Sequence, residues 1–190
     1  GINHDGKIDK AYKLVDEAAR AGANLIKFQT AIPELVQSPN SPKAKYQELG
    51  TLSSKTALEM TKNFHLSLNS FSFLKNYVES LGLTFFSTPF DLESAKYLNS
   101  IGQTLFKIPS GEIDNWPLLE AIAQYAEEII ISTGIAKIDE IEKCVNYFKK
   151  FFTNSQITVM QCDSSYPAQL EFANINVLST YRNMFETNIG

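Results

Sequence analysis

Two lysines interrupt segments that are otherwise apolar. Lys27 lies in the segment 24–30 and Lys107 in the segment 105–109. A lysine is costly to bury unless its ammonium group meets an anion. Either lysine could form a structural ion pair, hold a phosphate or carboxylate, or form a Schiff base with a carbonyl substrate. Because one protein carboxylate neutralises only one ammonium group, two such lysines favour an anionic substrate.

Polar side chains gather at the ends of these and similar segments. Gln29 shares a strand face with Lys27, because alternate residues of a strand point the same way. Residues with hydroxyl groups follow or end further apolar segments: Thr88, Ser110, Ser132, Ser164 and Tyr166. Each signal is weak alone, since serine and threonine often cap helices. Together the hydroxyl groups would suit a phosphorylated acid, whose many oxygens need donors.

Glu112 is the acidic residue of the same set. It follows Lys107 and Ser110 in the run Lys107-Ile108-Pro109-Ser110-Gly111-Glu112. Its carboxylate could orient or deprotonate a water molecule. The alternative is that it caps the helix that begins near Trp116-Pro117.

Histidines and cysteines offer little further chemistry. His4 could contact substrate or cap the first helix, whereas His65 and Cys162 are expected to be structural. Two histidines far apart in the sequence are a poor basis for a metal site, which usually needs three or more protein ligands. We therefore predict no metal ligand within the chain.

Helices and strands alternate along the chain and must position these residues. Apolar residues at helical spacing predict helices at 9–20, 68–81, 92–101, 118–125, around 138–148 and at 175–185. Short apolar runs predict buried strands at 24–30, 84–88, 105–109, 128–133 and 157–162. Asp9 is expected to cap the first helix, and Gly22, Gly82 and Gly102 to end helices. Such strand–helix–strand units predict a parallel sheet covered by helices.

The position of the polar residues separates two possible α/β architectures. An open doubly wound sheet concentrates its chemistry at one switch point and opens with a G-x-G-x-x-G fingerprint, which this sequence lacks. Polar groups at the ends of many strands are typical of a (β/α)8 TIM barrel. We predict that residues 1–190 are a partial barrel, with the first and the last strands missing. Another strand is expected to begin near Asn188.

Residues 31–66 differ from the regular pattern. The segment contains Pro33, Pro39, Pro42 and Gly50 among polar residues and is longer than a routine connection. We expect an irregular loop that serves as a lid or binding loop, or that is disordered.

Composition limits the class of protein. The 190 residues are 44% hydrophobic and carry a net charge of −4. This charge argues against unspecific binding of nucleic acid or anionic membrane. No apolar run reaches the length of a membrane span, and the sequence does not open like a signal peptide. The two cysteines suit a reducing compartment, so we predict a cytoplasmic protein.

Several motifs also occur in the order seen in the sialic acid synthase family. They are Gly-Ile-Asn-His-Asp-Gly at 1–6, Lys27-Phe28-Gln29-Thr30, Phe86-Ser87-Thr88-Pro89-Phe90-Asp91, Lys107-Ile108-Pro109-Ser110-Gly111-Glu112, Ser132-Thr133-Gly134 and Cys162-Asp163-Ser164-Ser165-Tyr166-Pro167. The chain resembles the bacterial branch that contains N-acetylneuraminate synthases and N,N'-diacetyllegionaminic acid synthases.

The resemblance implies a transferase reaction between phosphoenolpyruvate and N-acetylmannosamine or a related acetamido sugar, which yields N-acetylneuraminate and phosphate. N,N'-diacetyllegionaminic acid is the alternative product. The resemblance also implies a divalent metal, Mn²⁺ or Mg²⁺, whose ligands lie outside this chain and which polarises the sugar aldehyde.

The resemblance assigns roles to the candidate residues. Phosphate and carboxylate binding falls to Lys27, Thr88, Lys107, Ser110 and Ser132. Gln29 and Tyr166 would face the sugar. Glu112 and Lys107 would be catalytic, with Glu112 handling the water or its proton. Ser164 stands where the family commonly has asparagine, in the phosphate pocket.

The resemblance further implies a homodimer when full length and a C-terminal antifreeze-like domain that this chain lacks, so the chain alone is expected to be inactive. Two other interpretations stay open. One is a class I aldolase in which Lys107 or Lys27 forms a Schiff base with pyruvate. The other is a non-catalytic fragment.

Overall fold

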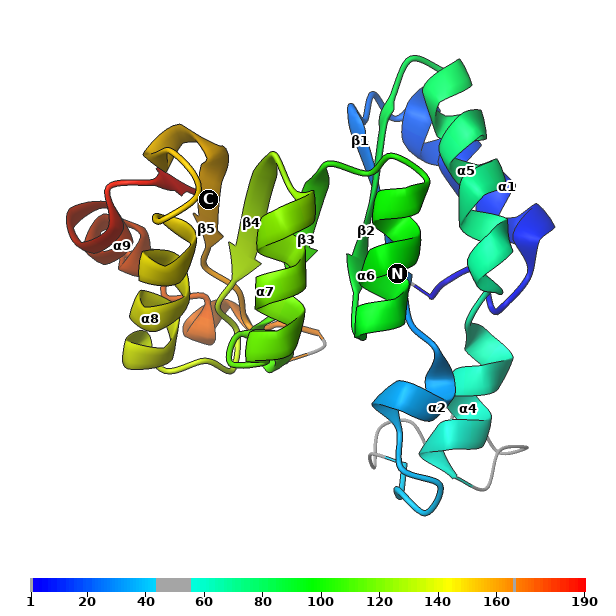
Figure 1. Cartoon of the computed structure of the whole chain (residues 1–190), viewed down its shortest axis with the longest axis horizontal. Coiled ribbons are helices and arrows are strands. Elements are labelled where there is room, and N and C mark those ends of the chain that lie inside the picture. Colours follow the sequence, from blue (N-terminus) through cyan, green and yellow to red (C-terminus); the bar gives the residue numbers. More distant parts are fainter. Residues whose placement is uncertain (1, 44–55, 166) are drawn as a thin grey trace. The chain divides into compact units, whose positions relative to one another are not determined.

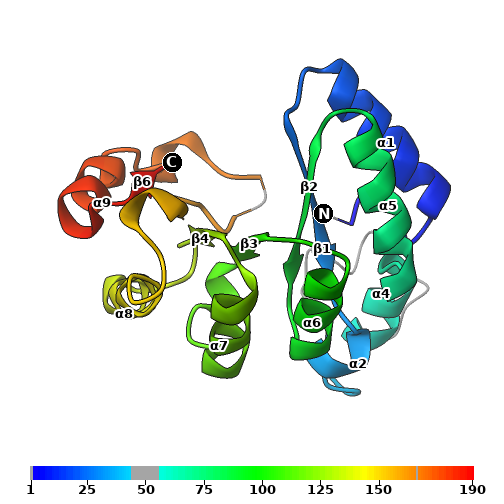
Figure 2. The same ribbon diagram turned by 45° about the horizontal axis from the view of Figure 1, so that its top comes forward.

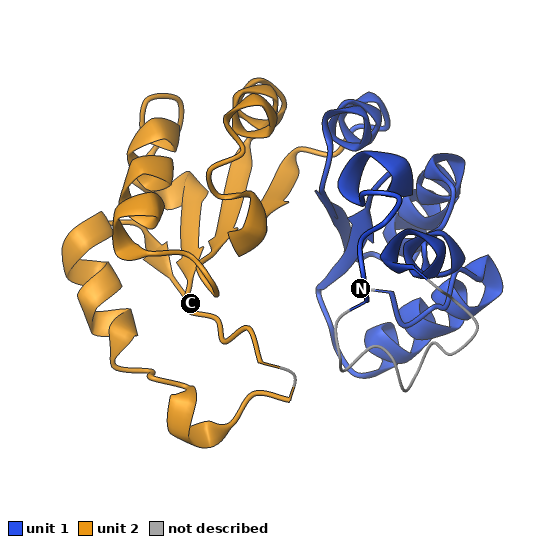
Figure 3. Ribbon diagram, turned by 90° about the horizontal axis from the view of Figure 1, so that it is seen from below, with its two compact units in different colours: residues 1–102 blue, residues 103–190 orange. Residues whose placement is uncertain are grey.

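The computed structural model describes residues 2–43, 56–165 and 167–190. The chain forms two compact units, shown in different colours in Figure 3. Unit 1 comprises residues 1–102 and unit 2 residues 103–190.

The described part of unit 1 contains two parallel strands among helices (Figure 1). In chain order its elements are α1 (Ile8–Arg20), β1 (Leu25–Thr30), α2 (Pro33–Val36), α4 (Ala57–Phe64), α5 (Leu68–Ser80), β2 (Thr84–Pro89) and α6 (Leu92–Ser100). β1 pairs with β2 along its whole length, from Leu25 opposite Thr84 to Thr30 opposite Pro89.

The two faces of the β1–β2 pair have different surroundings. Phe28 points to the face covered by α5, where its ring stacks on Phe85 at 5.6 Å and meets Phe71 edge-on at 6.3 Å. Figures 1 and 2 show α1 and α5 side by side on this side of the strands. Because side chains alternate along a strand, Lys27 and Gln29 point to the opposite face.

Helix ends in unit 1 match the glycine signals, but one cap does not. Gly22, Gly82 and Gly102 follow α1, α5 and α6 with φ of 84°, 75° and 82°, a conformation that glycine adopts without strain. The prediction that Asp9 caps α1 is wrong. The N-cap is Lys7, and Asp9 lies in the first turn. A carboxylate there interacts favourably with the positive end of the helix dipole.

Residues 31–66 contain regular structure, so the expectation of an irregular loop is wrong for the described part, 31–43 and 56–66. Glu34 of α2 forms an ion pair of 2.7 Å with Lys62 of α4. Thr56 caps α4 by accepting a hydrogen bond of 3.2 Å from the backbone of Glu59. The rest of the predicted loop, 44–55, lies outside the described residues.

Unit 2 is built on a sheet of parallel strands in the order β3-β4-β5-β6. Its strands and α-helices are β3 (Leu105–Ile108), α7 (Trp116–Tyr125), β4 (Glu128–Ser132), α8 (Ile138–Phe148), β5 (Ile157–Met160), α9 (Val177–Phe185) and β6 (Asn188–Ile189). It also contains the short 3₁₀ helices η1 (Ser110–Glu112), η2 (Asn154–Gln156) and η3 (Leu170–Phe172).

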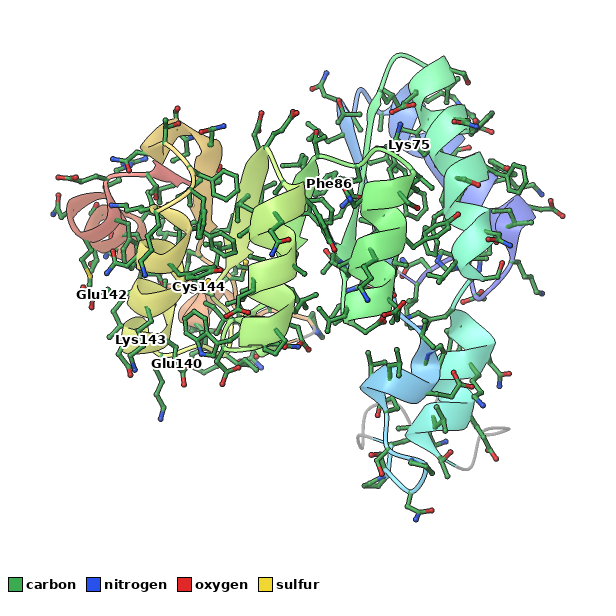
Figure 4. The ribbon with its side chains drawn as sticks, in the orientation of Figure 1. Lys75, Phe86, Glu140, Glu142, Lys143 and Cys144 are labelled. Carbon is green, nitrogen blue, oxygen red and sulfur yellow. The ribbon has the colours of Figure 1, made fainter. Side chains whose placement is uncertain are left out.

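One face of the unit 2 sheet is apolar and fully buried. Its side chains are at most 1% exposed: Phe106, Ile108, Ile129, Ile131, Ile157 and Val159. α7 and α8 lie on the same side of this sheet (Figures 1 and 2), and the rings of Trp116 and Tyr147 join the two helices at 5.6 Å. Cys144 is buried on α8, whereas its neighbour Lys143 is exposed (Figure 4). Burial raises the pKa of Cys144 to about 12.

The described residues therefore contain parallel strands, each joined to the next through at least one helix. This is the repeating unit of a (β/α)8 barrel, and the chain has the fold of part of such a barrel, as the sequence predicted. β6 begins at Asn188, where a further strand was expected. Within the described ranges, every helix is too short or too polar to cross a lipid bilayer.

Candidate functional site

Unit 1 places three of the candidate residues on the face of β1–β2 that points away from α5. Gln29 lies directly opposite Thr88 in the register, and Lys27 lies two residues before Gln29. Lys27 is exposed, so the cost of burying its ammonium group does not arise in this structure. Gln29 is half-buried, and Thr88 is only 1% exposed.

The hydroxyl group of Thr88 is the unusual feature of this face. Its oxygen is buried and has no hydrogen-bond partner among the residues that the structure describes. Leaving a buried polar group unsatisfied costs about 1–3 kcal/mol, and such groups in native proteins usually have an explanation. An oxygen-rich ligand that accepts a hydrogen bond from Thr88 would supply one.

The opposite face of the same strands uses its polar groups for the fold. The hydroxyl groups of Thr30 and Ser87 are 2.7 Å apart and buried. Asp91, which is 7% exposed, accepts hydrogen bonds from the backbone of Ile32 at 2.9 Å and from Ser94 through its backbone and its hydroxyl, at 2.8 and 2.7 Å. Ser87 therefore differs from Thr88, although both belong to the Ser-Thr-Pro run.

His4 and Lys27 border the same cavity in unit 1. Asn3 also contributes to this cavity, which has a volume of about 330 Å³ and lies between α1 and β1. His4 does not cap α1, because its Nδ1 accepts a hydrogen bond of 3.2 Å from the backbone of Gly6. Gly6 has φ of +67°, and a Cβ there would lie 2.4 Å from the carbonyl oxygen of Asn63. Only glycine fits this turn, which fixes the His4 ring beside the cavity.

In unit 2, Lys107 lies on the sheet face opposite the buried apolar face. It is half-buried and directly opposite Ile130 in the register. Ser132 follows Ile130 by two residues, so it shares the face of Lys107, one step nearer the carboxyl end of the sheet. The Ser132 hydroxyl donates a hydrogen bond of 3.3 Å to the carbonyl of Ile108, a long and weak interaction.

The loops after β3, β4 and β5 converge at Gly134. A Cβ placed on Gly134 would lie 2.9 Å from the Ser110 hydroxyl oxygen and 2.6 Å from that of Ser164. Two candidate residues from loops far apart in the sequence thus lie around one point. Gly134 belongs to the Ser-Thr-Gly run, but residue-type reasoning missed it because glycine carries no functional group.

Two other polar residues near these loops are engaged in the fold. Thr133 donates to the carbonyl of Met160 from its hydroxyl at 2.9 Å and from its backbone at 3.2 Å, which ties the end of β4 to the end of β5. Glu112 is half-buried and accepts a hydrogen bond of 2.7 Å from the side chain of Asn115. Asn115, and not Glu112, is the N-cap of α7. Glu112 therefore orients the capping residue without capping the helix itself.

The remaining candidates are His65, Cys162 and Tyr166. His65 is half-buried, its Nδ1 lies 3.0 Å from the carbonyl oxygen of Thr61, and burial lowers its pKa. Cys162 is half-buried and forms no disulfide. Tyr166, predicted to face a sugar, lies outside the described residues. Among residues 2–43, 56–165 and 167–190, no group of three or more His, Cys, Asp or Glu side chains could hold a metal ion. The described residues therefore offer no ligand set for the metal that the resemblance implies, whose ligands were expected outside this chain.

Comparison with known proteins extends these observations. The model of the NeuB family matches residues 14–190. The N,N'-diacetyllegionaminic acid synthase of Campylobacter jejuni is 37% identical over 191 residues, which cover 100% of this chain and 57% of that protein. The enzyme of the same name from Legionella pneumophila is 35% identical, with 100% and 54% covered.

A solved structure is similar along the whole chain. The crystal structure of the N-acetylneuraminic acid synthetase from Leptospira borgpetersenii, in complex with citrate, superposes with a TM-score of 0.86 at 35% identity. The match covers 100% of this chain and 61% of that one. The chain therefore spans between half and two thirds of the length of these relatives.

Proposed function

This chain belongs to the NeuB family, and from that premise we propose that it forms part of a synthase that condenses phosphoenolpyruvate with an open-chain acetamido sugar. The observation that carries the proposal is the pair of hydroxyl groups, from Ser110 and Ser164, around Gly134. Hydroxyl groups that converge from separate strand ends of a barrel are suited to an oxygen-rich anion.

Phosphoenolpyruvate supplies that anion with its phosphate and its carboxylate. In unit 2, Lys107, Ser110, Ser132 and Ser164 contribute one ammonium group and three hydroxyl groups to its binding. For unit 1, taken by itself, we propose that the Lys27 ammonium group and the buried Thr88 hydroxyl bind an oxygen-rich anionic group, which gives Thr88 an acceptor that the described residues do not offer it. The citrate in the Leptospira relative, itself an oxygen-rich anion, is consistent with this role.

The reaction forms one carbon–carbon bond. The enol carbon of phosphoenolpyruvate attacks the sugar aldehyde, water adds to the resulting oxocarbenium carbon, and phosphate leaves with cleavage of its bond to carbon. Glu112 accepts the proton of that water through the carboxylate that also holds Asn115. Lys107 offsets the negative charge of phosphoenolpyruvate. Gln29 and Tyr166 bind the sugar.

The complete protein extends this proposal. The 190 residues are one part of a catalytic barrel, and a divalent ion, Mn²⁺ or Mg²⁺, is held by residues outside this chain. The complete protein also has a C-terminal antifreeze-like domain and forms a homodimer in the cytoplasm. This chain by itself is then inactive.

The identity of the sugar has two candidates. N-acetylmannosamine would give N-acetylneuraminate, and the diacetamido trideoxy sugar would give N,N'-diacetyllegionaminic acid. The names of the Campylobacter and Legionella relatives favour the second sugar. The name of the Leptospira relative, at 35% identity, favours the first.

The test uses the complete protein that contains this chain, with Mn²⁺, phosphoenolpyruvate and each sugar in turn. We expect phosphate release that depends on one sugar, together with a product whose mass is that of the corresponding sugar acid. Borohydride trapping with pyruvate is run beside it, and a reduced adduct on Lys107 or Lys27 would establish the class I aldolase instead. Absence of both phosphate release and adduct with every acetylated hexosamine would support the non-catalytic fragment.

A further inference from the structure

We propose that Gly134 is a positioning residue, which lets the hydroxyl groups of Ser110 and Ser164 hold one anionic group of phosphoenolpyruvate. The inference rests on the proposed function and goes beyond it, because it assigns a role to a residue without a functional group. It concerns the substrate anion alone and makes no assumption about the sugar.

Backbone conformation does not explain why this position is glycine. The glycines of the described chain with positive φ are Gly6, Gly22, Gly82 and Gly102, and Gly134 is not among them. An alanine could therefore adopt the backbone of Gly134 without strain. What excludes a side chain is the pair of hydroxyl oxygens, at 2.6 and 2.9 Å from the place of its Cβ.

The backbone at Gly134 has little freedom to move away from the two serines. Thr133 is held to the carbonyl of Met160 by its hydroxyl and by its N–H, at 2.9 and 3.2 Å. The carbonyl of Thr133 accepts a hydrogen bond of 2.7 Å from the backbone of Ala136. A methyl group at position 134 would therefore displace the serine side chains and not the loop.

Displacing two hydroxyl groups is a change in the site more than in the fold. The atoms that a Cβ would meet are the tips of serine side chains, which reach another rotamer by turning about one bond. The Gly134→Ala variant should therefore fold, with Ser110 and Ser164 turned away from the point they now share. The cost should appear in the binding of the anion.

The experiment compares Gly134→Ala with Gly111→Ala in the complete protein. Gly111 follows Ser110, has no positive φ, and a Cβ there would meet nothing within 4 Å, so it is a matched control. Because hydrogen bonds to charged groups are each worth roughly 10- to 100-fold in affinity, Gly134→Ala should raise the KM and the Kd of phosphoenolpyruvate by about that factor. The KM of the sugar should stay within about twofold, and Gly111→Ala should match the wild type.

The same substitution in a Ser164→Ala background tests the route. If Gly134→Ala acts by displacing the Ser164 hydroxyl, its effect on the Kd of phosphoenolpyruvate should shrink once that hydroxyl is gone. Gly134→Ala is also combined with Ser110→Ala. If Gly134→Ala changes the Kd of phosphoenolpyruvate by the same factor in the wild type, in Ser164→Ala and in Ser110→Ala, the inference is overturned. An unchanged Kd in Gly134→Ala would also overturn it.

Calorimetric titration with phosphoenolpyruvate keeps the two proposals separable. A wild-type protein that binds phosphoenolpyruvate but turns over no sugar would refute the proposed function and still test Gly134. Wild-type turnover together with an unaffected Gly134→Ala variant would refute the inference alone. Equal unfolding midpoints of Gly134→Ala and the wild type are expected, and a large loss of stability would show that Gly134 serves the fold instead.

Discussion

The two units handle polar side chains in different ways. In unit 1, the β1–β2 pair separates them by face: Thr30, Ser87 and Asp91 hold the fold on one side, while Gln29 and Thr88 share the other. In unit 2, a residue that holds the fold and a residue of the candidate site are neighbours in one loop. Thr133 is hydrogen-bonded to Met160, and Gly134 lies beside Ser110 and Ser164. Strand parity therefore predicts the role of a polar residue in unit 1, whereas only three-dimensional contacts separate the roles in unit 2.

The largest expected effect on activity comes from Lys107, a candidate site residue of unit 2. Lys107→Ala in the complete protein should lower kcat/KM for phosphoenolpyruvate by about 10²- to 10³-fold, the scale for removing one group that stabilises charge in a reaction. Phosphate release and circular dichroism measure the activity and the fold. Lys96→Ala is the control, because the ammonium group of Lys96 is exposed and forms a surface ion pair with Glu93. Unfolding of Lys107→Ala would identify Lys107 as part of a structural ion pair.

A substitution on the face of unit 1 that contains Thr30, Ser87 and Asp91 should give the largest loss of stability. Asp91→Ala removes the acceptor of three hydrogen bonds, a part-buried one from Ile32 and two buried ones from Ser94, and with them the cap of α6. We expect the free energy of unfolding to fall by about 2–3 kcal/mol, measured by urea denaturation. Asp139→Ala, which breaks an exposed pair with Lys143 at 3.6 Å, should cost less than about 0.5 kcal/mol. Similar losses in both variants would contradict the division by face.

A pair of identical substitutions tests that division directly. Thr30→Val breaks the buried bond to Ser87 and should reduce stability by about 1–2 kcal/mol, with little change in kinetics. Thr88→Val removes a hydroxyl without a partner among the described residues, so stability should hold while the KM of phosphoenolpyruvate rises. Denaturation and steady-state kinetics on both variants measure the two effects. The reverse pattern would exchange the roles of the faces.

The smallest effect concerns pH and the fold of unit 1. Burial lowers the pKa of His65 below its ordinary value of 6.5, although the carbonyl of Thr61 and the charge of Asp91 partly oppose this. Near pH 6 the unfolded chain therefore binds more protons at this position than the folded chain, so the free energy of unfolding falls as pH drops from about 7 to 5. His65→Gln should reduce this slope, measured by denaturation at several pH values. An unchanged slope would show that His65 does not contribute.

Much of the architecture was predictable because helices and strands of ordinary length have clear periods. The strand at 24–30 and the helix at 68–81 differ from β1 and α5 by one residue at an end. α2, with four residues, is too short for a helical period. α4 had a usable signal that was missed: Thr56 and Glu59 have the spacing of a cap followed by an acidic residue.

The site was predictable in residue type more than in arrangement. Alternation along β1 correctly put Lys27 and Gln29 on one face. The pairing of Glu112 with Asn115 and the approach of Ser110 and Ser164 to Gly134 depend on loop conformations that no local pattern encodes. Reasoning from functional groups could not identify Gly134, because glycine has no functional group and the role proposed for it is to leave space.

The spacing of partners along the chain has a consequence for the order of folding. The bond between Thr30 and Ser87 joins residues 57 positions apart, whereas that between Ser132 and Ile108 spans 24. Closing the longer loop costs about 0.8 kcal/mol more chain entropy, before any effect of the intervening helices. Non-local pairing also slows a folding transition state. We therefore expect the β3–β4 ladder to acquire protection from hydrogen exchange early in refolding and the β1–β2 ladder to follow.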